Sequence, residues 1–275
     1  GGTSSNPSIL NLPIRQTGTT NILSGSYITF ADFVNQFENT LNIQQNATLT
    51  SSANNFKSAI TNQGTLNLTT GVLTPAITGD GTVETFNQVN FNNKVSNKIH
   101  INNSSELTTN ASNIGNSVIN DGILKIGGGN LNYDVTGSGS IQVSSAVGIY
   151  TYISQPLTIY NTWNVTMSAD NIGTNVSGVE SAITYLGGTL NYAVSGSVYG
   201  YVASGYTLYV NARHNYRITV NGNANLYINA SIQANTFDVN SGGYIYLTGG
   251  STSQSYRGSG TVVIEGINKA PSTVT

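Results

Sequence analysis

The sequence predicts an all-β protein, most simply an elongated parallel β-solenoid (β-helix) of stacked coils. Three observations predict this fold class. Val, Ile and Thr, which favour strands, recur along all 275 residues, and Tyr joins them in the second half. Short runs of alternating residues end in Asn or Gly at a spacing of about 8 to 12 residues, as in all-β chains. A glycine-led phrase also repeats along the chain. Tandem β-sandwich domains use the same short strands and turns, so they form the alternative.

Residues 1–60 lack the repeated phrase and are expected to form an atypical N-terminal arm or cap. The end of a solenoid needs such a unit because an open end coil exposes its core and a strand edge. Phe30, Phe33, Val34 and Phe37 fall at helical spacing, which predicts a short capping helix over residues 30–37.

The same region offers another interpretation, an extended arm that pairs with a neighbouring copy. It carries apolar residues outside any repeat, and these are candidate interface residues: Ile9, Leu10, Leu12 and Ile14.

The repeated phrase is a Gly followed by a short alternating strand, with a second glycine-led strand close behind it. Its four copies cover residues 64–68, 129–133, 188–192 and 243–247. Their separation of roughly 55 to 65 residues suits about three coils of roughly 20 residues each. We therefore expect a first β-repeat region over 61–128 and a second, Tyr-rich one over 129–275.

Tyrosine is confined almost entirely to that second region. Tyr27 is the only Tyr before residue 130, and the other fifteen follow from Tyr133 onward. Tyr residues two apart lie on one face of a strand and could stack into an aromatic stripe. Such a stripe is either a half-buried sheet face or a contact surface for a neighbouring subunit or a glycan. The candidate residues are Tyr150, Tyr152, Tyr199, Tyr201, Tyr244 and Tyr246.

Asparagine makes up about one residue in seven. Its side chain tolerates the left-handed backbone of turns and can stack in amide ladders where coils repeat. The ladder interpretation predicts Asn at matching places in successive coils.

Charge is scarce, since only 7% of residues are charged and the net charge is -2. An ordinary soluble domain carries about 25% charged residues. Net charge keeps folded proteins apart, so this composition favours self-association into a homo-oligomer or homopolymer. It offers no basic field for nucleic acid, and no apolar run approaches the roughly 18 residues of a membrane helix.

Catalytic and metal-binding patterns are missing from the sequence. The eleven acids are dispersed, and the two histidines, His100 and His214, belong to no nucleophile motif. We expect no enzyme activity and no cofactor. Calcium is conceivable from long-range ligands, although no calcium motif is present. Arg213, His214 and Arg217 form the one local concentration of positive groups, which is either an anion or partner contact or a solvated loop.

The phrases at residues 64–68, 187–192 and 258–264 resemble the passenger repeats of autotransporter adhesins and similar bacterial surface proteins. This resemblance covers about residues 60 to 265. It implies an exported right-handed parallel β-helix displayed outside the cell or at its surface. The chain carries no C-terminal membrane barrel of the kind that completes an autotransporter.

These observations together predict a non-enzymatic structural subunit of an extracellular bacterial filament, fibre or surface coat. Strand addition and lateral packing would join its copies. One alternative is an adhesin or phage fibre that binds host glycans through its Tyr-rich half. Another is a polysaccharide-degrading β-helix enzyme, which the dispersed acids disfavour.

Overall fold

The computed structural model describes residues 2–10, 18–30, 37–229, 236–248, 255–265 and 273–274. It is a parallel β-solenoid of about 13 turns with 54% of its residues in strands, which confirms the predicted fold class. The described strand pairs are parallel, as between β5 (Thr48–Ser51) and β7 (Thr65–Leu68). A sandwich needs antiparallel sheets. The sandwich alternative is therefore wrong.

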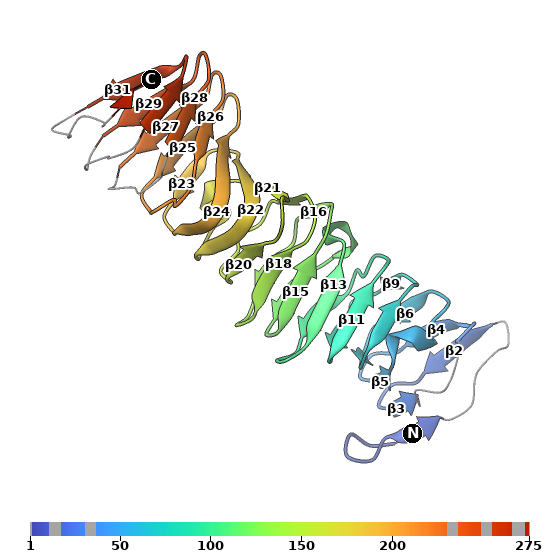
Figure 1. Ribbon diagram of the computed structural model, residues 1–275. Coiled ribbons are helices and arrows are strands. Elements are labelled where there is room, and N and C mark those ends of the chain that lie inside the picture. Colours follow the sequence, from blue (N-terminus) through green and yellow to red (C-terminus); the bar gives the residue numbers. More distant parts are fainter. Residues whose placement is uncertain are drawn as a thin grey trace. The chain divides into compact units, whose positions relative to one another are not determined.

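The chain divides into two compact units. The first comprises residues 1–129 and 133–140, and the second comprises residues 130–132 and 141–275. The first unit runs from blue to green in Figure 1 and the second from green to red. The division lies close to residue 130, where the tyrosine content changes.

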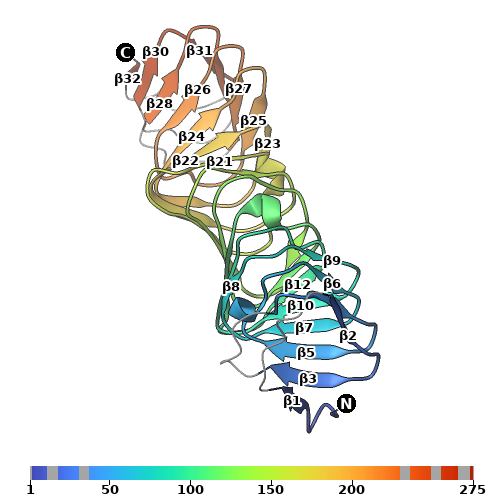
Figure 2. The ribbon, with the colours of Figure 1, turned by 90° about the vertical axis from the view of Figure 1, so that its right-hand side faces the viewer.

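The strands of the first unit lie on three ladders, and one of these ladders faces the viewer in Figure 2. The first ladder contains β1 (Ser8–Leu10), β3 (Tyr27–Phe30), β5, β7, β10 (Thr82–Thr85), β12 (Lys98–Ile101), β14 (Val118–Asn120) and β17 (Val135–Thr136). The second ladder contains β2 (Thr19–Ile22), β4 (Thr40–Ile43), β6 (Ile60–Asn62) and β9 (Ile77–Thr78). The third contains β8 (Gly71–Leu73), β11 (Gln88–Phe91), β13 (Glu106–Thr109) and β15 (Ile123–Ile126).

The second unit is built in the same way from two long ladders and a short one. The fourth ladder contains β18 (Ser140–Val143), β20 (Leu157–Ile159), β22 (Val176–Tyr185), β24 (Val194–Val202), β26 (Ile218–Val220), β28 (Thr236–Val239), β30 (Ser255–Gly258) and β32 (Thr273–Val274). The fifth contains β23 (Gly188–Leu190), β25 (Thr207–Val210), β27 (Asn225–Ile228), β29 (Tyr244–Leu247) and β31 (Thr261–Ile264). The short ladder contains β16 (Asn130–Leu131), β19 (Val147–Ile149) and β21 (Asn164–Met167).

The core is a set of aliphatic columns, because in-register parallel strands place one inward side chain directly above another. Leu208, Leu226 and Ile245 form one such column in the second unit, and all three are fully buried. The matching column of the first ladder consists of Leu49, Leu66, Val83, Ile99, Val118 and Val135. Burial of these columns is the main stabilising contribution to the fold.

Glycine is required where one coil turns directly above the next. A Cβ atom on Gly81 would lie 2.2 Å from the carbonyl oxygen of Gly64, and one on Gly139 would lie 2.2 Å from that of Gly122. No side chain fits at such a distance from main chain. Only glycine therefore fits at Gly81 and Gly139, which lead the second strand of the repeated phrase, because successive coils approach closely there.

Buried asparagines satisfy the main chain at the corner between the second and first ladders. The Asn97 side chain is fully buried and its Nδ2 donates to the carbonyl oxygens of Asn62 (2.8 Å) and Gly81 (3.1 Å). Asn62 in turn donates to Thr82 O and accepts from the Gly64 N–H. These amides pair carbonyl groups that the turn removes from the regular ladder.

The described residues before position 61 belong to the same ladders as those after it. Strands β5 and β7 pair over their full length, across the boundary predicted at residue 60. The predicted helix over 30–37 falls largely outside the described residues. Of its apolar positions, Phe30 ends strand β3, and Phe37 forms a bridge with Phe56. These three rings pack together in the core, with the Phe30 and Phe37 centroids 4.2 Å apart.

The four repeated phrases do not occupy one equivalent place in the coil. Residues 188–190 and 244–247 lie on the fifth ladder as β23 and β29, three coils apart, as the spacing predicts. Residues 65–68, in contrast, form β7 of the first ladder, and residues 130–131 form β16 of the short ladder. Coil lengths vary, since register partners are 16 residues apart between Thr82 and Lys98 but 21 apart between Tyr27 and Thr48.

Candidate functional site

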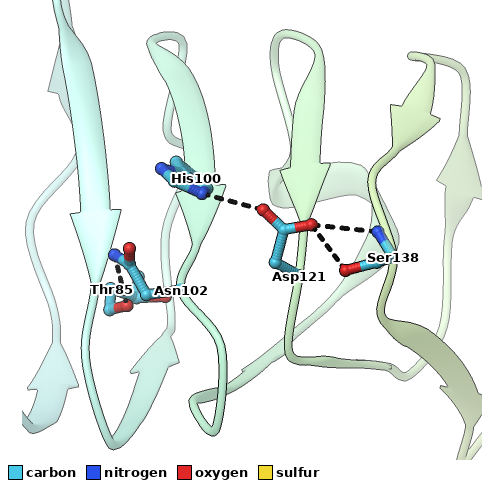
Figure 3. A network of polar contacts seen from close by, with 5 residues as sticks. All are labelled: Thr85, His100, Asn102, Asp121 and Ser138. Atoms are coloured by element: carbon cyan, nitrogen blue, oxygen red, sulfur yellow. Dashed lines mark hydrogen bonds and ion pairs between the residues drawn. The ribbon is translucent and has the colours of Figure 1, made fainter.

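A polar network on the first unit joins the side chains of three successive coils, His100, Asp121 and Ser138 (Figure 3). His100 lies on β12, Asp121 follows β14, and Ser138 follows β17. The Asp121 carboxylate contacts His100 Nε2 at 3.2 Å through Oδ2. Its Oδ1 accepts hydrogen bonds from the Ser138 N–H and hydroxyl, both at 2.9 Å. The spacing of the ladder brings these residues together from 21 and 17 positions apart.

This network holds its carboxylate ionised. The Ser138 N–H, the Ser138 hydroxyl and His100 together keep the pKa of Asp121 below its usual range, in that order of importance. In a hydrolase triad the imidazole lies between the serine and the acid and removes the serine proton. Here the acid lies between the other two residues, and the hydroxyl donates to it. The arrangement joins neighbouring coils through hydrogen bonds, and it does not place the imidazole beside the serine hydroxyl to activate it as a nucleophile.

A groove of about 430 Å³ beside this network brings a second acid close to Asp121. Glu106 lines the same groove and pairs with Lys125 at 2.7 Å. Each of the two carboxylates thus has a partner of its own, and a carboxylate with a lowered pKa is a poor proton donor. The lining otherwise consists of Asn87, Gln88, Asn103, Ser104, Ser105, Gly122 and Ile123.

The second unit carries an aromatic stripe of the predicted kind. Of its three tyrosines, only Tyr246 is among the candidate residues that the sequence indicates. Tyr209, Tyr227 and Tyr246 are register partners on β25, β27 and β29, and we call them the tyrosine stack. Their ring centroids are 4.9 Å and 4.4 Å apart, with interplanar angles of 20° and 6°. Partial burial, followed by the neighbouring Tyr246 and Tyr209 phenols, raises the pKa of Tyr227.

The predicted asparagine ladder is confirmed beside the tyrosine stack. Asn191, Asn211 and Asn229 each follow a strand of the fifth ladder. Asn211 donates to Asn191 Oδ1 at 2.9 Å, and Asn229 donates to Asn211 Oδ1 at 3.0 Å. The first unit has a matching contact from Asn42 to Asn21 at 3.0 Å. Amides at equivalent coil positions therefore pair along the solenoid axis.

The other predicted tyrosines are dispersed over the second unit. Tyr150 and Tyr152 lie outside the strands and are about half exposed. Tyr199 and Tyr201 lie on β24, where Tyr199 meets Tyr216 edge to face at 87°, with the hydroxyls 3.4 Å apart. The remaining pair does adjoin the stack, since Tyr244 lies 6.2 Å from Tyr246.

The missed signal is visible in the sequence once the coil length is known. Tyr209 and Tyr227 occupy the third position of their strands, Thr207–Val210 and Asn225–Ile228, as Tyr246 does in Tyr244–Leu247. Spacings of 18 and 19 residues separate the three tyrosines. A spacing of two residues does not identify Tyr209 and Tyr227, because their stacking partners lie one coil away in the sequence.

The three positive residues around position 214 do not lie on one shared surface. Arg213 is exposed, whereas His214 is fully buried. Arg217 is neutralised by Asp238, with Nε 2.6 Å from Oδ2. The three residues therefore present no shared positive surface to an anion.

His214 lies in the core of the second unit. Its ring meets Tyr185 at a centroid distance of 6.3 Å, above Gly200, where a Cβ atom would lie 3.1 Å from His214 Nε2. Burial lowers its pKa to about 4, opposed only weakly by the main chain of Tyr216. Burial likewise raises the pKa of Tyr185. Among the described residues neither His214 nitrogen has a hydrogen bond of normal geometry, so the ring is held neutral by packing alone.

The predicted N-terminal interface residues are described only in part. Ile9 and Leu10 lie on β1, and Ile9 is 65% exposed. Leu12 and Ile14 lie outside the described residues.

The described part of the chain brings no three His, Asp or Glu side chains together as a metal site would need. Its helices are single turns at Ala53–Asn55, Ala111–Asn113 and Ala169–Asn171, none of which could span a bilayer. No protein-family model, curated protein or solved structure matches the chain.

Proposed function

We propose that this protein is a non-enzymatic structural subunit of an extracellular bacterial assembly, such as a filament, fibre or surface coat. Its copies join by strand addition and lateral packing. One observation carries the proposal: within the described residues, β1 pairs with β3 along one edge and with no strand along the other, and its Ile9 side chain is exposed. An unpaired strand edge is a template for pairing with another chain.

The surroundings of β1 favour a second copy of the chain as its partner. Ile9 and Leu23 are 65% and 60% exposed. A groove of about 270 Å³ is lined by Ile9 together with Ile22, Ile28 and Phe30. A strand laid along β1 would gain main-chain hydrogen bonds and would cover this apolar surface. A second copy can supply that strand from an end of its ladders, since β31 pairs only with β29 among the described residues.

Low surface charge supports the same proposal. In the described residues we find three ion pairs, at His100–Asp121, Glu106–Lys125 and Arg217–Asp238. The Glu106–Lys125 and Arg217–Asp238 pairs join opposite charges on neighbouring coils, which leaves still less uncompensated charge. Copies of such a molecule repel one another weakly, so modest contacts suffice for association.

The test places a charge at the proposed contact and compares it with the same change elsewhere. Ile9→Lys is expected to reduce the polymers seen by electron microscopy and to shift the protein toward monomer. Val179→Lys is the matched control, because Val179 is 63% exposed on β22 of the second unit. Leu10→Lys serves as a second variant, because Leu10 lies on β1 and lines the same groove. Equal polymer formation in all three variants and the unmodified chain would refute the proposed contact.

Glycan binding is the second candidate function, and a groove in the first unit favours it. This groove of about 440 Å³ is lined by Asn42, Gln44, Gln45, Gln63 and Asp80. Amide and carboxylate groups of this kind donate and accept hydrogen bonds, as sugar hydroxyls require. The tyrosine stack is less suited to a sugar, because its ring faces cover one another.

A glycan array probed with monomeric protein distinguishes the two sites. Binding that is lost with Gln63→Ala and kept with Tyr227→Phe would assign the ligand to the amide groove. Binding that is kept with Gln63→Ala and lost with Tyr227→Phe would assign the ligand to the Tyr-rich half, the glycan site that the sequence suggests.

The enzyme alternative has the least support. Glu106 and Asp121, the two acids that line one groove, pair with Lys125 and with the His100 and Ser138 groups. A glycosidase needs one acid of raised pKa beside an ionised one. Polysaccharide cleavage that disappears with Asp121→Asn would overturn this part of the proposal.

A further inference from the structure

We infer that the tyrosine stack is an oxidative modification site, at which neighbouring phenols of Tyr209, Tyr227 and Tyr246 couple to dityrosine and link adjacent coils covalently. This inference is independent of the proposed function, because the bond forms within one chain. The co-reactant is a one-electron oxidant, such as hydrogen peroxide used by a haem peroxidase.

The geometry of the stack favours coupling between neighbours. The Tyr227 and Tyr246 rings lie 4.4 Å apart and within 6° of parallel, and the Tyr209 and Tyr227 rings lie 4.9 Å apart. In-register parallel strands place equivalent ring atoms opposite one another. Ring stacking at these centroid distances brings the ortho carbons of neighbouring phenols close to each other, and rotation about the side-chain bonds closes the remaining gap.

Exposure allows the oxidant to reach the stack. Tyr209 is 41% exposed, and Tyr227 and Tyr246 are half-buried on the outer face of the fifth ladder. The nearest strand residues of the same face are uncharged, among them Thr189 below Tyr209 and Val263 above Tyr246. A radical formed on any one ring has a second phenol in van der Waals contact.

The reaction balances with one peroxide for each bond. Each phenol loses one electron and one proton and becomes a phenoxyl radical. Two radicals join through their ortho carbons, and the two rings regain aromaticity as the ortho hydrogens move to the phenol oxygens. Hydrogen peroxide takes up the two electrons and two protons and becomes two water molecules. The product has lost two hydrogen atoms in total.

Other tyrosines provide an internal comparison. Tyr150 and Tyr152 are more exposed than Tyr209, yet neither has an aromatic partner among the described rings. If exposure alone decided the site of coupling, these two residues would form links between chains. If the stack decides it, the links form within the chain.

The experiment treats dilute full-length protein with a haem peroxidase and hydrogen peroxide and maps the products by mass spectrometry. Trypsin cleaves after Arg213 and Arg217, so a Tyr209–Tyr227 bond joins two peptides. Tyr227 and Tyr246 share one tryptic peptide, which a protease that cleaves before Asp238 divides between them. We expect a monomeric product with dityrosine fluorescence and one of these two bonds.

Two conservative variants sharpen the result. Tyr227→Phe removes the middle phenol, and we expect the intrachain dityrosine yield to fall at least tenfold. Tyr246→Phe is expected to redirect coupling to the Tyr209–Tyr227 pair, which is a gain of one product and not a loss. Tyr150→Phe is the control and should leave the yield unchanged. Coupling only between chains, coupling mainly at Tyr150 or Tyr152, or an undiminished yield in Tyr227→Phe would each overturn the inference.

Discussion

The two units share one way of coiling but stack their polar and aromatic side chains in different places. In the first unit, buried amides such as Asn62 and Asn97 bind main-chain carbonyl groups at a corner, inside the solenoid. In the second, Asn211 and Asn229 pair along the outside, next to the tyrosine stack. The aromatic clusters differ in the same way, since the Phe30, Phe37 and Phe56 rings are buried whereas the rings of the tyrosine stack are partly exposed.

The difference distinguishes buried side chains, which determine how the coil turns, from exposed side chains, which lie on its outer surface. A buried amide that loses its partner leaves carbonyl groups without hydrogen bonds, whereas an exposed amide can turn to water. The first unit therefore depends on particular residues at its corners. The second can change its outer stacks with little loss of stability, which leaves them available for contacts or modification.

The largest expected effect comes from a methyl group at a corner of the first unit. Gly81→Ala would place Cβ 2.2 Å from the carbonyl oxygen of Gly64, so the corner must open. We expect a loss of more than about 3 kcal/mol in the free energy of unfolding, measured by urea denaturation. Gly205→Ala is the control, because its Cβ meets nothing within 4 Å and only the φ of +80° costs about 1 kcal/mol. Equal losses would mean that the coils do not touch at Gly81.

Acid should destabilise the second unit through His214. Its pKa is about 4 in the folded chain, against an ordinary value of 6.5 for histidine, so between these pH values the unfolded chain binds a proton that the folded chain excludes. Stability therefore falls as the pH drops from 6.5 to 4, by about 3 kcal/mol in total. His214→Leu should remove this component of the pH dependence, measured by urea unfolding at a series of pH values.

His100 provides the comparison for that experiment. It is partly exposed, and His100→Gln should leave the acid-induced loss in place. An identical pH profile for His214→Leu and the unmodified chain would show that His214 is not held neutral in the core.

Removing a buried amide should cost less than a main-chain clash. Asn97→Ala removes the side-chain donor from the carbonyl oxygens of Asn62 and Gly81 in a buried corner, although Asn62 O keeps its hydrogen bond from the Gly81 N–H. We expect a loss of about 2 kcal/mol. Hydrogen exchange at the Gly81 and Thr82 amides should rise in parallel. Unchanged stability would mean that water replaces the side chain.

The smallest effect is expected on the outer ladder of the second unit. Asn211→Ala removes two amide contacts, to Asn191 and from Asn229, but all three side chains are exposed. We expect a loss of about 0.5 kcal/mol. A loss as large as that of Asn97→Ala would erase the distinction between the two regions.

Sequence reasoning predicts the fold well because the solenoid is specified by local features. Alternating strands and close-turning glycines are each visible within a few residues, as at Gly81 and Gly139. Their repetition predicts parallel coils. The phrase spacing misplaces β7 and β16 because coil length varies between 16 and 21 residues, and that variation depends on how each turn packs on the coil below it.

The candidate sites were harder to predict because they join residues one coil apart. The stacking of Tyr209 on Tyr227 depends on the register of the fifth ladder, as does the contact of His100 with Asp121 on the first. For the same reason, residues that are close in sequence do not always share one surface of the fold. Arg213 and His214 are adjacent in sequence, yet Arg213 is exposed whereas His214, which forms a bridge with Val194, is buried in the core.

The central claim is that this nearly uncharged solenoid associates with copies of itself, and sedimentation velocity of the full chain over a range of concentrations tests it most directly. The account predicts a weight-average sedimentation coefficient that rises with concentration and changes little between low and high salt. A single monomeric boundary at every concentration and salt level would contradict it.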